Sequence, residues 1–349
     1  MADFYRLVLN DQYRLVAENG ETLLQTMQRY GYRMRTSCRN GVCEICEAEL
    51  LEGRLQQRYP AKLIDSSDNE TECPAVALAC TSVPLTDVRV KIKGLLAPGE
   101  LSVKKLVCDI TQIEQLNHDV YRVRLHLPAT GTLAAEFHAG QYLDILLPDG
   151  KQASFSIGSA PEQGRELELH IRHIPDSEMS NAIVQHLQNN PTVEIEIPKG
   201  ECYLQAEKIA ADTAVIFAAA STGFAQVKSV VEHLLANQHS NPIYIYWGAR
   251  VEEDMYLERL PQQWAAEHTN VHFIPVVSEP ENSPGWNGRT GLLPAAVLED
   301  FSSFENVEVF ASGSPAMVYA LLDACEDKGF SQQQMHSDVF SYAPRPAKA

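Results

Sequence analysis

Three cysteines stand within nine positions of the segment SCRNGVCEIC, which covers residues 37–46. Cys38, Cys43 and Cys46 have the spacing C-x4-C-x2-C, which differs from the paired C-x2-C knuckles of zinc sites. It matches the loop that holds a plant-type [2Fe-2S] cluster. Gly41 between them gives the backbone the freedom to turn its N–H groups toward the cluster sulfides. The alternatives are a zinc site or a group of inert buried thiols.

A [2Fe-2S] cluster takes four thiolates, so one more cysteine is needed. Cys73 and Cys80 both lie downstream of the loop. We favour Cys80, because it comes shortly before the alternating stretch DVRVKI, a predicted strand that would fix its position. The other cysteines, Cys108, Cys202 and Cys325, are isolated and are expected to be small core residues.

Composition and charge exclude several classes of partner. The chain has 349 residues, 45% of them apolar, and a net charge of -18. Nucleic acid is excluded because its binding needs an excess of Lys and Arg. The N-terminus has no apolar signal segment, and the longest apolar run, AVIFAAA at 214–220, is too short for a membrane span. We therefore expect a cytoplasmic protein without a membrane partner, in which clustered cysteines serve metal or redox chemistry.

The elements that would position this chemistry fall into blocks. An alternating N-terminal block covers 1–93, and the Gly- and Pro-containing stretch GLLAPGELS at 94–102 reads as a linker. Short alternating runs over 103–205 predict a small β-barrel. Apolar runs alternate with helical stretches over 206–349, which predicts a parallel sheet with crossover helices. There the segment AVIFAAASTGFAQVKS predicts a strand, a turn and a helix whose N-terminus can bind a pyrophosphate.

Three later stretches follow in a particular order: IYIYWGAR with Asp254 and Tyr256, then NGRTG, then FASGSPAMV. With the cysteine loop, they make the chain resemble the ferredoxin-NADP reductase superfamily in its version with an N-terminal plant-type ferredoxin domain. It is similar to CDP-6-deoxy-glucoseen reductases, oxygenase reductase components and NAD(P)H:flavin reductases. The resemblance implies a multidomain α+β and α/β protein. Its parts would be a β-grasp ferredoxin domain, a six-stranded antiparallel flavin-binding β-barrel and a parallel α/β nucleotide-binding domain.

The resemblance also implies site residues. Phe155 would lie against the isoalloxazine of FAD, and Ser156 would place a hydroxyl near its reacting nitrogen. Ser156 and Ser312 are the implied catalytic residues. The other implied contacts belong to the flavin or to NAD(P)H. The implied flavin contacts are Gln141, Tyr142, Phe155, Ser156, Ile157, Ser180 and Phe340, with Asp338 beside the last. The implied nucleotide contacts are Thr222, Gly223, Gly313, Pro315 and Met317.

The sequence departs from the family pattern around the flavin. Ala153 replaces the arginine that pairs with the flavin pyrophosphate, and Asp176 and Ser177, with Glu178 beside them, replace a pair of glycines. Losing a guanidinium and gaining carboxylates weakens binding of a pyrophosphate, so FAD is expected to be weakly bound. Arg172 is either a surface charge or a substitute cation for this site.

Further departures lie in the nucleotide domain. Ser221 and Gln226 replace a glycine and a proline of the nucleotide turn, and Ser312 replaces a cysteine.

Three functions remain open. The first and favoured one is an electron-transfer reductase that passes electrons from NAD(P)H through FAD to the cluster and on to a protein or small-molecule acceptor. The second is an NAD(P)H:flavin reductase with loosely bound flavin. The third is a cluster protein without enzymatic activity, in which the flavin site has decayed. The sequence identifies neither the acceptor nor the preference between NADH and NADPH, for which Arg250 is a single weak indication.

Overall fold

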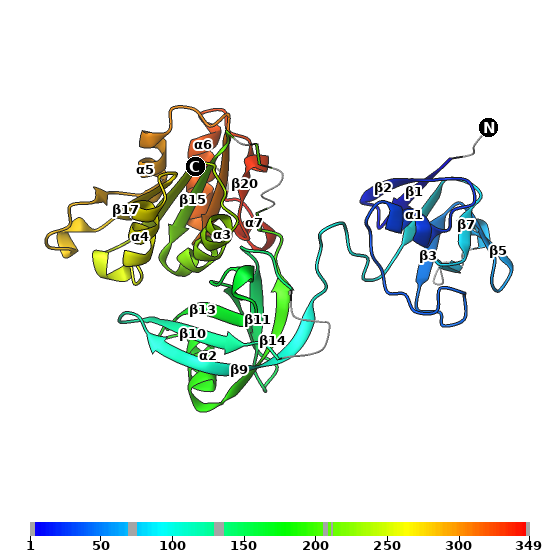
Figure 1. Cartoon of the computed structure of the whole chain (residues 1–349), viewed down its shortest axis with the longest axis horizontal. Coiled ribbons are helices and arrows are strands. Elements are labelled where there is room, and N and C mark those ends of the chain that lie inside the picture. Colours follow the sequence, from blue (N-terminus) through cyan, green and yellow to red (C-terminus); the bar gives the residue numbers. More distant parts are fainter. Residues whose placement is uncertain (1–3, 69–74, 129–135, 205–208, 211, 347–349) are drawn as a thin grey trace. The chain divides into compact units, whose positions relative to one another are not determined.

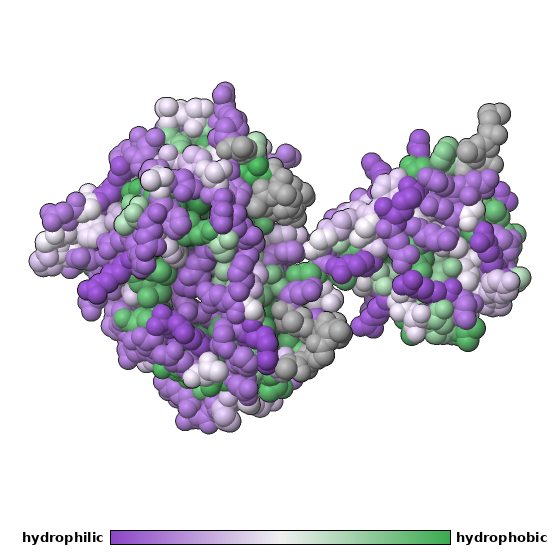
Figure 2. Space-filling model, viewed as in Figure 1, coloured by the Kyte–Doolittle hydropathy of each residue, from purple (hydrophilic) through white to green (hydrophobic). Residues whose placement is uncertain are grey.

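The computed structural model describes residues 4–68, 75–128, 136–204, 209–210 and 212–346. The chain separates into two compact units, Met1–Ser102 and Val103–Ala349. Figure 1 shows the first unit in blue to cyan, and the second in cyan to red. On the face drawn in Figure 2, hydrophilic residues predominate on both units and apolar residues form small separate patches. Among the described residues, none of the helices is long and apolar enough to cross a bilayer.

The first unit is built on a mixed five-stranded sheet with the strand order β2-β1-β8-β3-β6. Strands β1 and β8 are parallel and the other neighbours are antiparallel. Helix α1 packs its buried Leu23, Leu24 and Met27 on this sheet, and a capping box between Thr22 and Gln25 fixes its start. The β-grasp prediction is confirmed. The bounds are β1 Tyr5–Leu9, β2 Tyr13–Ala17, α1 Leu23–Arg29, β3 Glu47–Glu52, β6 Ala75–Leu78 and β8 Val88–Lys91.

A smaller sheet of order β5-β4-β7 completes this unit. Two of its strands lie near the predicted cluster ligands in sequence: β4 follows the cysteine loop after β3, and β7 begins two residues after Cys80. Their bounds are β4 Arg54–Gln57, β5 Lys62–Asp65 and β7 Ser82–Pro84, with the short helix η1 at Ser66–Asp68.

The second unit begins with six antiparallel strands in the order β12-β11-β14-β9-β10-β13. A bridge between Ile157 and Leu169 joins the two edges, so the sheet closes into the predicted barrel. The buried residues of α2, among them Ile183 and Leu187, belong to the core of this barrel. The bounds are β9 Lys104–Gln115, β10 Val120–His126, β11 Tyr142–Leu146, β12 Gln152–Ser156, η2 Pro161–Gln163, β13 Glu166–Arg172, α2 Glu178–Asn189 and β14 Thr192–Lys199.

The remainder forms the predicted parallel sheet, with the order β18-β17-β16-β15-β19-β20. Successive strands run outward from β15 in one direction, and then the chain returns to place β19 on its other side. Such a reversal opens a crevice at the carboxyl ends of the two central strands, here β15 and β19. The strand bounds are β15 Ala214–Ala220, β16 Ile243–Ala249, β17 Val271–Val277, β18 Arg289–Thr290, β19 Val307–Ser312 and β20 Met335–His336.

Helices cover both faces of this sheet, and each face has its own hydrophobic core. Helices α3 and α4 contribute to one core, and α5 and α6 to the other. The helix bounds are η4 Ser221–Gly223, α3 Phe224–Ala236, η5 Glu252–Asp254, α4 Arg259–Glu267, η6 Pro280–Asn282, α5 Leu293–Asp300, α6 Pro315–Glu326, η7 Gln332–Gln334 and α7 Val339–Tyr342.

Candidate functional site

The cysteine loop directs its backbone N–H groups at one sulfur. The N–H of Cys43 donates to Cys38 Sγ at 3.3 Å. Hydrogen bonds from the Asn40 backbone, then from the thiol and backbone of Cys43, and from Val42 lower the pKa of Cys38 to about 6. A sulfur that receives several N–H groups is stabilised as the thiolate, the form that binds iron.

The loop reaches this shape through a strained backbone. Arg39, Gly41 and Glu44 have positive φ values of 57°, 83° and 58°. A Cβ atom at Gly41 would lie 2.2 Å from the carbonyl oxygen of Tyr59. Only glycine fits there, which is the role that the sequence suggested for it.

The four predicted ligands form two pairs. Cys38 contacts Cys43 in the loop, while the thiol of Cys46 interacts with that of Cys80. Cys46 and Cys80 are buried, and burial raises the pKa of Cys46 to about 11. Within the described part of the chain, no set of three His, Cys, Asp or Glu side chains is arranged to hold a single metal ion. Cys73, the alternative fourth ligand, lies outside that part.

This arrangement fits a [2Fe-2S] cluster, because each of its two irons takes two protein ligands beside the bridging sulfides. The remaining described cysteines are buried in hydrophobic cores of the second unit. Burial raises the pKa of Cys108 and of Cys325 to about 12, and that of Cys202 well above its usual value. These three thiols are therefore inert, as expected.

The predicted nucleotide turn, which is η4 (Ser221–Gly223), lies at the crevice between β15 and β19. A Cβ atom at Gly223 would lie 2.3 Å from the carbonyl oxygen of Ser312, so the turn touches the end of β19. A Cβ atom at Gly313 would lie 2.6 Å from Met317 Cε and 2.9 Å from Ala220 Cβ. The structure thus brings Gly223, Ser312, Gly313 and Met317 together. Pro315 opens α6 behind them.

Helix α3 presents its first N–H groups at the same edge. Among the described residues no side chain caps its start or that of η4. Uncapped N–H groups at the N-terminus of a 13-residue helix, beside the carboxyl ends of parallel strands, are the arrangement that binds phosphate groups. Thr222 lies in this turn.

Trp247 of β16 supports the turn from below. Its indole N–H donates to the carbonyl oxygen of Ser221 at 3.1 Å, and its ring stacks on Phe224 with centroids 3.9 Å apart. Ser221 has φ = 52°, an uncommon value for a residue other than glycine. The hydrogen bond from Trp247 to the turn was not apparent from the sequence.

Strand β12, which carries predicted flavin contacts, pairs with β11, and this pairing places Ser156 opposite Tyr142. The half-buried ring of Tyr142 lies over Gly200, where a Cβ atom would come within 2.7 Å of the ring. Phe155 packs partly against the barrel core. An aromatic ring and a hydroxyl on adjacent strands at the mouth of a barrel suit a planar, partly polar ligand such as the flavin ring.

Other predicted flavin contacts are engaged within the protein. Gln141 is buried, and its amide donates to Gly200 O at 2.8 Å and accepts from His138 N–H at 2.7 Å. Ile157 is fully buried in the barrel core. The hydroxyl of Ser180 accepts from Ile174 N–H at 2.8 Å. The side chains of these residues therefore support the barrel.

Arg172, the possible substitute cation, donates through Nε to Asp119 at 2.6 Å.

The C-terminal segment meets both parts of the second unit. Gln226 donates to Asp338 at 2.8 Å and to Gly140 O at 2.7 Å, so the residue that replaces a family proline joins α3 to the barrel. Burial raises the pKa of Asp338 to about 6, although hydrogen bonds from Gln226 and the Cys202 backbone oppose the shift. The ring of Phe340 packs against the ring of Tyr319, with centroids 5.6 Å apart.

Comparisons with known proteins agree with this structure. The 2Fe-2S iron-sulfur cluster binding domain matches residues 8–85, the oxidoreductase FAD-binding domain 107–203, and the oxidoreductase NAD-binding domain 217–322.

Among individual proteins, the chain is 34% identical to protein RfbI of Salmonella typhimurium over 92% of each chain. It is 29% identical to a CDP-6-deoxy-L-threo-D-glycero-4-hexulose-3-dehydrase reductase of Yersinia pestis, over 93% of this chain and 94% of that one. The cytochrome P450 reductase GcoB of Amycolatopsis superposes with a TM-score of 0.64 at 25% identity, covering 96% of this chain and 98% of that chain.

The predicted resemblance and the predicted activity are therefore confirmed. The chain belongs to the ferredoxin-NADP reductase-type family that carries an N-terminal [2Fe-2S] ferredoxin domain, and it is an NAD(P)H-dependent flavin and iron-sulfur oxidoreductase that transfers electrons.

Proposed function

We propose that Cys38, Cys43, Cys46 and Cys80 are the four ligands of the cluster, two to each iron. The observation that carries this proposal is the pairing of Cys38 with Cys43 and of Cys46 with Cys80. The domains are proposed to cover 1–93, 103–205 and 206–349, with a linker at 94–102. When bound, FAD accepts a hydride from NAD(P)H and releases electrons singly to the cluster.

The nucleotide is proposed to bind at the crevice between β15 and β19. The N–H groups of Thr222 and Gly223 would hold its pyrophosphate, and Gly313, Pro315 and Met317 would line the nicotinamide side. The contact of Gly223 with Ser312 supports this assignment, because it brings the two halves of the site side by side. Ser312 would then supply a hydroxyl at the reacting edge.

The flavin ring is proposed to lie against Tyr142 and Phe155, with the Ser156 hydroxyl at its reacting edge and Phe340 nearby. Gln141, Ile157 and Ser180 would contribute through their backbone, because their side chains are engaged in the barrel. The Nε of Arg172 is held by Asp119, and its two Nη groups, which bond to none of the described residues, would be available to the flavin pyrophosphate. With Ala153 in place of an arginine, we expect FAD to dissociate in part during gel filtration.

The proposed acceptor is a one-electron redox centre on a partner enzyme. The Yersinia pestis relative is named as the reductase of a hexulose dehydrase, and a relative from Comamonas as the reductase component of terephthalate 1,2-dioxygenase. Both are 29% identical to this chain over 93% of its length. The test is to ask which purified enzyme this protein reduces with NAD(P)H, a hexulose dehydrase or a dioxygenase. The enzyme that is reduced identifies the class of acceptor.

Anaerobic reduction by NADH tests the proposed ligands. In the wild type, NADH should bleach both the flavin and the cluster absorbance. Cys80→Ser should lose the iron and the cluster spectrum, because one of four thiolates is missing, while FAD is still reduced. Cys325→Ser is the matched control, since it changes a buried thiol in the second unit, and it should keep both spectra. An intact cluster in Cys80→Ser would contradict the assignment of the fourth ligand.

A further inference from the structure

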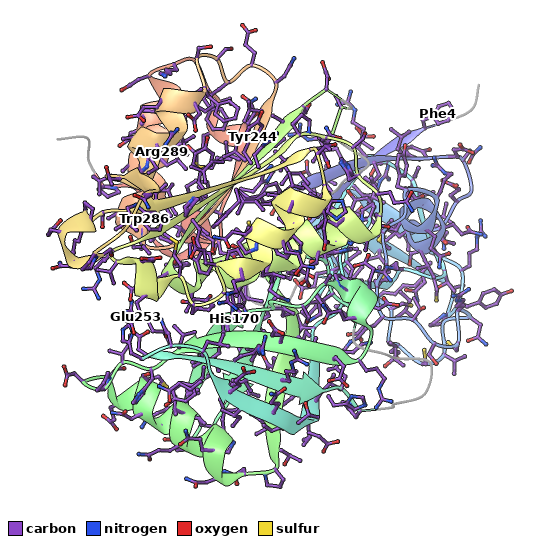
Figure 3. The ribbon with its side chains drawn as sticks, turned by 60° about the vertical axis from the view of Figure 1, so that its left-hand side comes forward. Phe4, His170, Tyr244, Glu253, Trp286 and Arg289 are labelled. Atoms are coloured by element: carbon purple, nitrogen blue, oxygen red, sulfur yellow. The ribbon has the colours of Figure 1, made fainter. Side chains whose placement is uncertain are left out.

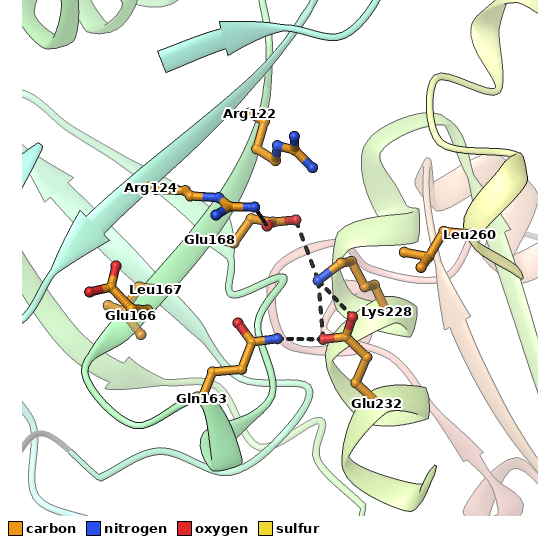
Figure 4. Close-up of a pocket in the computed structure, with 9 residues that line it drawn as sticks. All are labelled: Arg122, Arg124, Gln163, Glu166, Leu167, Glu168, Lys228, Glu232 and Leu260. Atoms are coloured by element: carbon orange, nitrogen blue, oxygen red, sulfur yellow. Dashed lines mark hydrogen bonds and ion pairs between the residues drawn. The ribbon is translucent and has the colours of Figure 1, made fainter. Parts of the chain in front are cut away.

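Lys228 lies on the face of α3 that meets the barrel, and its side chain is only 6% exposed. It borders a cavity of about 250 Å³ between β10, β13, α3 and α4 (Figure 4). Such deep burial is rare for a lysine and is costly unless the ammonium group is fully paired.

The ammonium group of Lys228 binds three groups. It donates to Gly158 O at 3.0 Å, to Glu232 at 3.0 Å, and lies 3.4 Å from Glu168. The neighbouring Ser229 donates its hydroxyl to Ser159 O at 2.7 Å. Gly158 and Ser159 follow the flavin strand almost directly, because β12 ends at Ser156. Two consecutive side chains of α3 thus hold two consecutive carbonyl groups beside the proposed flavin site.

The same helix carries the proposed nucleotide site at its N-terminal end. Lys228 lies five residues after Gly223, which is about 7 Å along a helix. A helix is stiff over this length, so the donors of Lys228 and Ser229 connect the turn that would hold the pyrophosphate to the chain segment that follows Ser156.

A buried network keeps the carboxylates around Lys228 in place. His170 Nε2 lies 2.9 Å from Glu168, and His170 Nδ1 lies 2.9 Å from the hydroxyl of Tyr256. Burial lowers the pKa of His170, so it is neutral, donates from Nε2 and accepts from Tyr256. Figure 3 shows His170 on its strand where the barrel meets the α/β domain.

Glu168 and Glu232 are each also held by a group other than Lys228. Burial alone would raise the pKa of Glu168, but the hydrogen bond from His170 and the charge of Lys228 outweigh it and lower that pKa to about 2. Gln163 donates to Glu232 at 2.9 Å, which anchors the second carboxylate from the barrel side. Lys228 is therefore held from both the helix and the barrel.

We propose that Lys228 is a positioning residue for hydride transfer, which sets the separation between the nicotinamide and the flavin by fixing Gly158 to α3. This inference rests on the proposed flavin and nucleotide sites. In the step concerned, two electrons and one proton leave NAD(P)H as a hydride, NAD(P)+ is formed, and FAD takes up the hydride. A change in this separation slows hydride transfer, because a displacement of about 1 Å can cost about a hundredfold in rate. It does not weaken the binding of either ligand.

The test is stopped-flow reduction of FAD-saturated Lys228→Met by NADH, with the 4-deuterated nucleotide in parallel. We expect the limiting rate of flavin reduction to fall by about 10- to 100-fold. The dissociation constant for NADH and the FAD content should stay near wild type, and the isotope effect should rise. A wild-type limiting rate in this variant would overturn the proposal.

A second variant distinguishes the proposed positioning role of Lys228 from a general loss of protein stability. Lys228→Met takes the ammonium group away from Glu168 and Glu232, of which Glu168 keeps Arg124 at 3.7 Å, and this destabilises the protein. Lys228→Met/Glu232→Gln removes one of these charges and should recover the thermal midpoint, while Gly158 O still lacks its donor and the rate stays low. If the rate recovers together with the midpoint, the role is only structural and the proposal is wrong. Should the single variant not fold, the double variant carries the same test.

Failure of the proposed function would look different. If neither NADH nor NADPH reduces FAD in the wild type or in any variant, the assigned flavin and nucleotide sites are wrong, irrespective of Lys228. Ser229→Ala, which removes only the bond to Ser159, should show a smaller loss of rate than Lys228→Met. An equal or larger loss in Ser229→Ala would contradict the assignment to Lys228.

Discussion

A methyl group at position 41 would lie 2.2 Å from a backbone oxygen, in a loop whose N–H groups converge on Cys38. Gly41→Ala must therefore shift the loop and should reduce the iron content per chain. Gly20→Ala is a matched control, because Gly20 has the same φ of 83° but its Cβ would meet only the end of the Arg58 side chain at 3.9 Å. Both variants carry a backbone strain of about 1–2 kcal/mol, and only the first should lose iron. Equal iron loss would mean that strain alone explains the effect.

The hydrogen bond from Trp247 to Ser221 gives a second prediction at the scale of single residues. Trp247→Phe keeps a ring to stack on Phe224 but removes the indole donor, so the Ser221 carbonyl keeps only its bond from the Phe224 N–H. Losing this hydrogen bond costs about 1 kcal/mol of the free energy that holds the turn in its binding shape. KM for NADH should therefore rise about fivefold, with little change in kcat.

Adding Ser221→Gly should restore KM, because glycine adopts φ = 52° without help. Trp264→Phe is the control, since Trp264 belongs to the same aromatic cluster and lies farther from Phe224, at 6.3 Å. An unchanged KM in Trp247→Phe would show that the turn does not depend on the indole.

Single residues were predictable from sequence where their spacing is local. The C-x4-C-x2-C loop and its glycine are of this kind, because neighbours in the chain determine their geometry. Gln141 and Gln226 were not predictable in the same way. Their amides bind Gly200 O, Gly140 O and Asp338, which are 59 to 112 residues away in sequence. Only the folded chain brings such partners together.

At the scale of elements, α7 depends on a carboxyl group whose titration opposes folding. The pKa of Asp338 is raised to about 6, so the folded state binds a proton that the unfolded state has already lost above about pH 4. Stability contributed by this group is fully present below pH 4 and is lost as the pH rises toward 6. Raising this pKa to about 6 makes the whole pH-dependent contribution of Asp338 to stability roughly 3 kcal/mol.

Asp338→Asn does not titrate, so relative to the wild type it should protect α7 increasingly between pH 4 and 6 and by a constant amount above. Hydrogen exchange of the amides in Val339–Tyr342, compared at matched pH, measures this difference. A difference that is independent of pH would show that Asp338 titrates normally.

The elements themselves were largely predictable, because alternation and apolar runs report on burial within one strand or helix. Strand order was not contained in these patterns. The placement of β19 beside β15, which creates the crevice, depends on how the chain returns across the sheet. Likewise, the edges of the barrel meet through Ile157 and Leu169, a pairing that no local pattern indicates.

At the scale of the whole molecule, the two units have separate hydrophobic cores in the part of the chain that the structure describes. Residues 103–349 alone should therefore fold, bind FAD and oxidise NADH with an artificial acceptor that takes electrons from the flavin. They should fail to reduce any acceptor that needs the cluster. Aggregation of this fragment, or loss of NADH oxidation at saturating FAD, would contradict the independence of the second unit.

All three tryptophans, Trp247, Trp264 and Trp286, belong to the α/β domain, and Trp247 lies directly under the nucleotide turn. The molecule therefore carries a built-in optical probe of one domain only. Tryptophan emission overlaps the absorption of reduced nicotinamide. A bound reduced dinucleotide should therefore quench the tryptophan fluorescence by energy transfer, and its own fluorescence should increase. Nucleotide occupancy could then be followed without a label, even in protein that holds neither flavin nor iron.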